Sequence, residues 1–173
     1  MIKPNSLQER LDLKRPRFNN QTKYTMRLKT KNSLLAISVG LVYLWFGTLK
    51  FFPNLSPAEG LAKNTIHELT FGLIPGDISI ILLAVWEVGI GLFLILSLWR
   101  RATVFLALVH MVFTFAPLLF FPNETFNDGP LHLTLLGQYI IKNLIIIAAL
   151  LMLWEPQRKR IYSASREYRL SGQ

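Results

Sequence analysis

The sequence predicts an all-α fold, a bundle of four transmembrane helices with a short amphipathic helix on its outer side. Three observations predict it. Of the 173 residues 51% are hydrophobic, although the formal net charge is +9. The apolar residues gather in four windows, and the basic residues lie between and beyond them. A soluble α-helical protein is the alternative, but too little polar surface would remain to cover four such helices.

The four apolar windows each have the length of a membrane span. They cover residues 33–52, 78–98, 102–121 and 135–154. A helix rises 1.5 Å per residue, so about 20 residues cross a hydrocarbon core of about 30 Å. In lipid every backbone N–H must be satisfied within the segment, which favours helices over strands. No apolar stretch precedes the first window, so we expect that window to stay in the membrane rather than to be cleaved as a signal peptide.

Lysine and arginine divide the connecting segments into two classes. Residues 1–32 contain nine of them, residues 155–173 contain five, and the turn between the second and third windows contains Arg100 and Arg101. The other two loops contain only Lys63. Because basic loops stay in the cytoplasm, we predict a multi-pass protein of the plasma (inner) membrane with both termini cytoplasmic. Residues 1–32 and 155–173 are then basic tails around a membrane domain at 33–154, and we expect them to meet anionic lipid rather than nucleic acid.

The first outer loop contains the pattern of a short amphipathic helix. We expect Ser56 as its N-cap, Pro57 as its first residue and Glu59 as the acidic member of a capping box. Apolar and polar side chains fall on opposite faces of a helix over 57–71. The apolar face has Ala58, Leu61, Ala62, Ile66 and Leu69, and the polar face has Glu59, Lys63, Asn64, His67 and Glu68. This helix is expected to lie on the membrane surface or to cap the bundle.

Four ionisable residues lie inside the windows: Lys50, Glu87, His110 and Lys142. Each costs roughly 2.5–3.5 kcal/mol to insert, so each needs a reason. At 1.5 Å per residue, Glu87 lies about 14 Å from the outer end of its window, His110 about 16 Å and Lys142 about 10 Å. These three are expected to meet, with an ion pair between Glu87 and Lys142. Lys50 lies near an outer end, from which its ammonium can also reach the head groups.

Small and polar neighbours of these residues predict a polar seam inside the bundle. The first window has the stripe Gly40, Tyr43, Gly47 and Lys50, the second has Glu87, Gly89 and Gly91, the third has His110 and Thr114, and the fourth has Gln138, Tyr139, Lys142 and Asn143. Glycines let helices approach closely in lipid. The seam has three interpretations: an ion pair that fixes helix register, a proton-exchanging or quinone-contacting site, and a path for an ion or solute. No metal or haem is expected, because the histidines are not paired and cysteine is absent.

Three stretches resemble a known family. They are Tyr43-Leu-Trp-Phe-Gly-Thr-Leu-Lys50-Phe-Phe-Pro53 with Leu55-Ser-Pro-Ala-Glu59, then Trp86-Glu87 followed by Gly89-Ile-Gly91, and Gly137-Gln-Tyr-Ile-Ile-Lys142-Asn143-Leu. In order and spacing they resemble the first, second and fourth helices of DoxX-like membrane proteins. The reactive-chlorine resistance inner-membrane proteins share the Gly-x-Leu-Lys-Phe start. The resemblance covers residues 33–154.

The resemblance implies a four-helix membrane protein linked to quinone. Founding members are small subunits of a quinol oxidase or a thiosulfate:quinone oxidoreductase, and other members are linked to oxidative stress. It implies a membrane or soluble oxidoreductase as partner, but no catalytic residues. The polar seam, the aromatic residues near it and the resemblance together predict quinone contacts at Tyr43, Trp86, Gln138 and Tyr139. Without cysteine or haem ligands the chain is not expected to move electrons alone, and whether it is an enzyme stays open. A non-enzymatic scaffold or assembly protein is the main alternative, a small transporter is the third, and a homo-oligomer is open.

Overall fold

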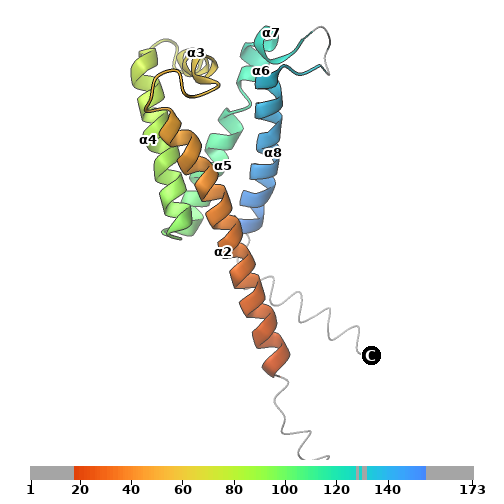
Figure 1. Ribbon diagram of the computed structural model, residues 1–173. Coiled ribbons are helices and arrows are strands. Elements are labelled where there is room, and N and C mark those ends of the chain that lie inside the picture. Colours follow the sequence, from red (N-terminus) through yellow and green to blue (C-terminus); the bar gives the residue numbers. More distant parts are fainter. Residues whose placement is uncertain (1–17, 128, 130–131, 155–173) are drawn as a thin grey trace, which may run out of the picture.

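The computed structural model describes residues 18–127, 129 and 132–154, and these form a bundle of helices (Figure 1). The elements are α2 (Phe18–Leu49), α3 (Glu59–Leu69), α4 (Gly76–Ile95), α5 (Arg100–Phe113), α6 (Pro117–Phe120), α7 (Pro122–Thr125) and α8 (Leu135–Trp154). In this described part, four stretches are long and apolar enough to cross a membrane: Met26–Leu49, Gly76–Ile95, Arg100–Phe120 and Leu135–Trp154. The chain is a multi-pass integral membrane protein, and the predicted fold class is confirmed.

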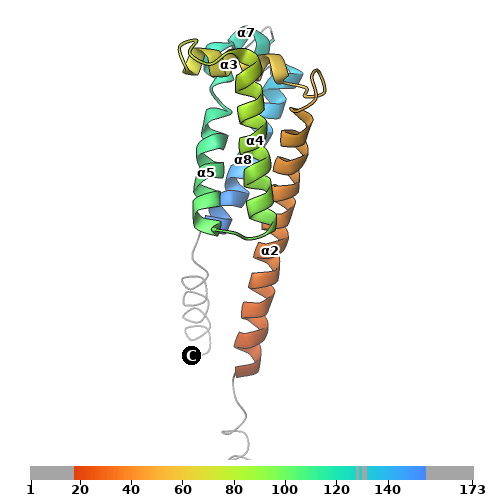
Figure 2. The ribbon, with the colours of Figure 1, turned by 90° about the vertical axis from the view of Figure 1, so that its left-hand side faces the viewer.

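The two ends of the bundle differ in what they contain. Helices α3, α6 and α7 gather at one end, which we call the α3 end (Figures 1 and 2). The opposite end, the Arg100 end, contains the turn from α4 to α5 and the end of α8, and α2 extends beyond it. Helix α2 packs against α4 and α8, and α5 packs against α4 and α8. The buried apolar core between them consists of Ala36, Val39, Tyr43, Ile90, Leu94, Val104, Ala107, Met111, Leu150 and Leu153.

Two prolines determine where α2 and α5 end. A proline lacks a backbone N–H, and its ring clashes with the carbonyl four residues earlier. Helix α2 ends at Leu49, four residues before Pro53, and α5 ends at Phe113, four residues before Pro117. The first window was predicted to reach residue 52, so this helix ends earlier than expected. It also begins at Phe18, so one helix passes through the predicted boundary between residues 32 and 33.

The end of α2 lies beside the middle of α4 rather than beside its end. A Cβ atom at Gly47 would lie 2.9 Å from both Val88 N and Glu87 Cβ. Glu87 is eleven residues from Gly76, the first residue of α4, which corresponds to about 16 Å of helix. Helix α2 accordingly stops below the α3 end of α4 in both views (Figures 1 and 2). A residue at the end of α2 is therefore deep in the bundle.

Glycines allow the close approach of α2 and α4. A Cβ atom at Gly91 would lie 2.7 Å from Leu44 N and 2.8 Å from Gly40 O, distances that real Cβ atoms essentially never show. The predicted stripe on the first span is thus confirmed as a packing surface. Gly89 differs, because a Cβ atom there would meet nothing within 4 Å. It shares the sequence motif with Gly91 but not its contact.

Helix α3 caps the bundle by packing against α4 and α6. Its amphipathic pattern is confirmed: Leu61 is buried, and Asn64, His67 and Glu68 are exposed. The predicted start is wrong. The helix begins at Glu59 after Ala58, and no side chain caps it. The Glu59 carboxylate instead accepts a hydrogen bond from the Asn54 backbone N–H at 2.9 Å, which holds the preceding turn.

Candidate functional site

A buried ion pair joins α2 to α4. Because α2 ends beside the middle of α4, Lys50 reaches inward, and its Nζ lies 2.6 Å from Glu87 Oε2. Both side chains are only 10% exposed. Lys50 Nζ also donates to the Phe46 carbonyl at 3.3 Å. The ammonium is therefore bound by protein groups and does not extend to the head groups.

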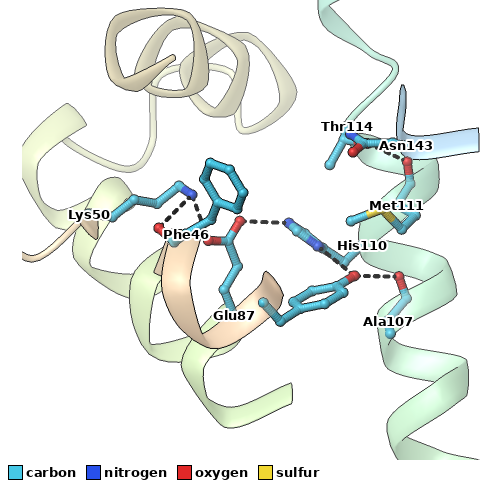
Figure 3. A network of polar contacts seen from close by, with 9 residues as sticks. Phe46, Lys50, Glu87, Ala107, His110, Met111, Thr114 and Asn143 are labelled. Atoms are coloured by element: carbon cyan, nitrogen blue, oxygen red, sulfur yellow. Dashed lines mark hydrogen bonds and ion pairs between the residues drawn. The ribbon is translucent and has the colours of Figure 1, made fainter. Parts of the chain in front are cut away.

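The other oxygen of the same carboxylate faces α5. His110 Nε2 lies 3.5 Å from Glu87 Oε1, and His110 Nδ1 lies 3.2 Å from the Tyr43 hydroxyl. The Tyr43 hydroxyl donates to the Ala107 carbonyl at 3.1 Å. Figure 3 shows this chain of contacts crossing from α2 and α4 to α5. We call Lys50, Glu87, His110 and Tyr43 the polar network.

The direction of the Tyr43 O–H decides which nitrogen of His110 carries hydrogen, and two arrangements fit the contacts. When the Tyr43 O–H donates to Ala107, its oxygen can only accept, so His110 Nδ1 must be the donor. A neutral imidazole then presents a lone pair at Nε2 towards the Glu87 carboxylate. That contact is attractive only with a proton between the two atoms, on His110 or on Glu87. With Lys50 as ammonium, the polar network then carries one positive charge.

A second arrangement of the same atoms contains one proton fewer. The Tyr43 O–H can turn to His110 Nδ1, so that Nε2–H donates to the Glu87 carboxylate. The charges of Lys50 and Glu87 then cancel. The two arrangements differ by one proton and by rotation of one hydroxyl. The polar network is therefore chemically suited to take up and release a single proton inside the membrane.

Lys142, the predicted partner of Glu87, lies elsewhere. Its side chain is exposed on α8, and its Nζ lies 4.9 Å from the centroid of the Tyr139 ring. The predicted Glu87–Lys142 pair is wrong, because α8 packs on α5 and α2 and turns the adjacent Asn143 inward instead. Asn143 Nδ2 donates to Thr114 Oγ1 at 3.1 Å. The sequence predicts both Thr114 and Asn143 in the polar seam, but it does not predict their contact.

The residues predicted to contact quinone do not form one site. Tyr43 is buried in the polar network, at 3% exposure. Trp86 is exposed on α4, and Gln138 and Tyr139 are exposed on α8. Helices α4 and α8 are separated by α2 and α5 (Figure 1). Conversely, the carbonyls of Phe46 and Ala107 complete the polar network, and no sequence signal points to them because every residue has a carbonyl.

A separate cluster of charges lies at the α3 end, away from the polar network. Lys63 Nζ lies 2.9 Å from Glu59 Oε1 and 3.0 Å from Asp77 Oδ1. The hydrogen bond from Lys63 and the bond from the Asn54 N–H lower the pKa of Glu59. The hydrogen bonds to Glu59 and Asp77 raise the pKa of Lys63. These charges tie α3 to the first turn of α4.

The fold and the polar network define a small multi-pass membrane protein with a charged site between its spans. No protein-family model, no curated protein and no solved structure matches this chain. Within residues 18–127, 129 and 132–154, no three His, Asp or Glu side chains gather as ligands for a metal ion.

Proposed function

We propose that this protein is a DoxX-like subunit of quinone-linked redox or oxidative-stress metabolism, and that the polar network exchanges protons there. The observation that carries the proposal is the Glu87 carboxylate, whose two oxygens contact Lys50 and His110. Lys50 and Glu87 belong to two of the stretches that resemble the family. They are 37 residues apart in sequence and in direct contact in space.

The chemistry of quinone suits this site. Reduction of a quinone to a quinol consumes two electrons and two protons. The polar network holds one exchangeable proton, so it would deliver the two protons one after the other and take up a new proton between them. Of the three hydrogens on the Lys50 ammonium, two are accounted for by Glu87 and the Phe46 carbonyl. The third can bind a quinone carbonyl oxygen. Phe46 is 40% exposed and its ring lies beside the Lys50 ammonium (Figure 3), so a quinone ring can pack against it.

The electrons have to come from a partner. The chain has no cysteine, and the two arrangements of the polar network differ in protons alone. We therefore propose an oxidoreductase partner that supplies or takes electrons, while this chain provides the proton-exchanging site.

A photoreactive quinone analogue tests the proposal in native membranes that contain the partner. We expect saturable labelling of α2 or α4 near Lys50, and competition by unlabelled quinone. The double variant Lys50→Met, Glu87→Gln should lose the labelling, whereas Lys63→Met, which removes a lysine outside the spans, should keep it. Absence of saturable labelling of the unmodified chain would contradict the proposal.

We also propose that the protein lies in the plasma (inner) membrane, with both termini cytoplasmic and the α3 end outside. The distribution of basic residues supports this orientation. Lys29 and Lys31 precede Asn32 on α2 by three residues and one residue, and Arg101 follows Arg100 on α5, so these basic residues lie near the Arg100 end. There Arg100 Nη2 donates to the Asn32 carbonyl at 3.0 Å, which joins α5 to α2. Basic residues are retained on the cytoplasmic side.

A membrane scaffold without a reaction of its own is the alternative. One observation favours it. In the apolar stretch of α8 only 17% of the residues are buried, against 33–39% in the other three spans. A helix so little covered by the described part of the chain offers a surface for assembly. Quinone labelling at Lys50 distinguishes the two functions, because a scaffold requires none.

A further inference from the structure

The exposed side of α8 carries polar residues at membrane depth. Gln138 and Lys142 are four residues apart, which places them on one face of the helix. Ile145 continues this face one turn further and is 73% exposed. Lys142 lies seven residues from Leu135, the first residue of α8, and thus about 10 Å along the helix. We call Gln138, Lys142 and Ile145 the α8 face.

Lys142 has a contact but no counter-charge within the described chain. Its Nζ lies over the ring of Tyr139 at 4.9 Å from the centroid. A ring face attracts an ammonium but only partly replaces its water. The inward polar residue of α8, Asn143, is bound to Thr114. Among the described residues, nothing covers the α8 face, which is therefore a polar surface of this helix open to a partner.

A second copy of the chain does not supply the missing charge. The four spans, all of them described, contain only two acidic residues, Asp77 and Glu87. Asp77 lies at the start of α4 and binds Lys63, and Glu87 is buried between Lys50 and His110. In a two-fold symmetric dimer that packs through α8, Lys142 of one copy would moreover lie near Lys142 of the other, since such an interface pairs each patch with itself. Like charges facing each other disfavour such a dimer.

We infer that the α8 face docks a transmembrane helix of a different protein, and that this helix carries an aspartate or glutamate at the depth of Lys142. The carboxylate would pair with the ammonium of Lys142. The amide of Gln138, one turn away, can donate to and accept from the same helix, as interhelical amides do in lipid. The inference rests on the membrane fold and the charge of Lys142, and it holds whether or not the partner is an oxidoreductase.

Site-specific photo-crosslinking in native membranes tests the inference. A photoreactive amino acid replaces Ile145 on the α8 face, and a matched control replaces Val112, which is 67% exposed on α5. We expect a crosslink to one membrane protein from position 145 and none to that protein from position 112. Adding Lys142→Met should lower the yield by at least about tenfold, whereas Lys142→Arg should keep it.

The decisive experiment exchanges the charges of Lys142 and of the partner's carboxylate. The partner segment crosslinked to position 145 must contain a carboxylate within its span, and its change to the neutral amide should weaken crosslinking as Lys142→Met does. Combining Lys142→Glu with lysine at that partner position should restore the yield. Crosslinks to lipid alone, a crosslink to a second copy of this chain, or a yield that is unchanged in Lys142→Met would each overturn the inference. Labelling by the quinone analogue at Lys50 is measured separately. A failure of the proposed function can therefore be told apart from a failure of this inference.

Discussion

Glu87 Oε2 lies 2.6 Å from Lys50 Nζ, at the place where the end of α2 meets the middle of α4. Neither side chain is more than 10% exposed, so removal of one takes away the ion-pair partner of a charge that stays buried in the bundle. This ion pair determines how stability responds to mutation of Lys50 and Glu87, separately and together.

The first prediction is a double-mutant cycle. Glu87→Gln and Lys50→Met should each lower the free energy of unfolding by about 3–5 kcal/mol, because an uncompensated charge remains buried. The double variant should recover part of this loss. Lys142→Met is the matched control: its effect should add to that of Glu87→Gln without recovery, because the two residues do not touch. Reversible unfolding in detergent measures the three single variants and the two double variants. Recovery with Lys142→Met instead of Lys50→Met would contradict the structure.

The second prediction concerns the hydroxyl of Tyr43. Tyr43→Phe removes both the bond to the Ala107 carbonyl and the partner of His110 Nδ1. We expect a loss of about 1–3 kcal/mol in the free energy of unfolding, since a buried polar group is left unsatisfied. Tyr139→Phe keeps the ring beneath Lys142 on the exposed side of α8 and should change stability little. Equal effects of the two changes would show that Tyr43 is not part of a buried network.

The third prediction separates two glycines of one helix. Gly91→Ala places a methyl group against the backbone of α2 at Leu44 N and Gly40 O, and such overpacking costs typically about 1–3 kcal/mol. Gly89→Ala meets no neighbouring atom within 4 Å. It should be neutral or stabilise the helix by up to about 1 kcal/mol, the difference in helix propensity. Thermal unfolding of the two variants provides the comparison, and destabilisation by Gly89→Ala alone would refute the described contact of α2 with α4.

The fourth prediction is an acid-induced loosening of α3. The pKa of Glu59 is lowered in the folded protein, so its bond to Lys63 stabilises α3 above the ordinary carboxyl pKa of about 4.3 and is lost as the pH falls through the folded value. The pKa of Lys63 is raised, so its contribution persists below about pH 10. A spin label at the exposed position 64 should become more mobile below about pH 4. Lys63→Met should make the label mobile at neutral pH, and a label unaffected by either change would contradict the assignment.

The fifth prediction is the orientation in the membrane. Reporter fusions after residue 65 or residue 128 should report the outside, and fusions after Arg101 or Arg160 should report the cytoplasm, because basic segments are retained there. A cytoplasmic signal at residue 65 would refute the four-span topology. A reversed pattern at all four positions would keep the fold and invert the bundle.

Features with a local or periodic origin could be read from the sequence. Apolar windows of span length predict the four transmembrane helices, because lipid requires each backbone N–H to be paired within its own segment. The glycine stripe of the first span predicts a packing face, since residues three and four apart share a helix side. The amphipathic pattern of α3 follows from the same periodicity, although its first residue does not, because Glu59 binds a backbone N–H in the preceding turn.

The partner of Glu87 was decided by the tertiary structure alone. Depth counted along each span favoured Lys142, because that count assumes that all helices end at the membrane surface. Pro53 ends α2 at Leu49, beside the middle of α4, and this brings Lys50 to the level of Glu87. The rotation of α8 then turns Asn143 inward and Lys142 outward. Which residues carry charge in the membrane is a property of the sequence, but which charges meet depends on the relative height and rotation of packed helices.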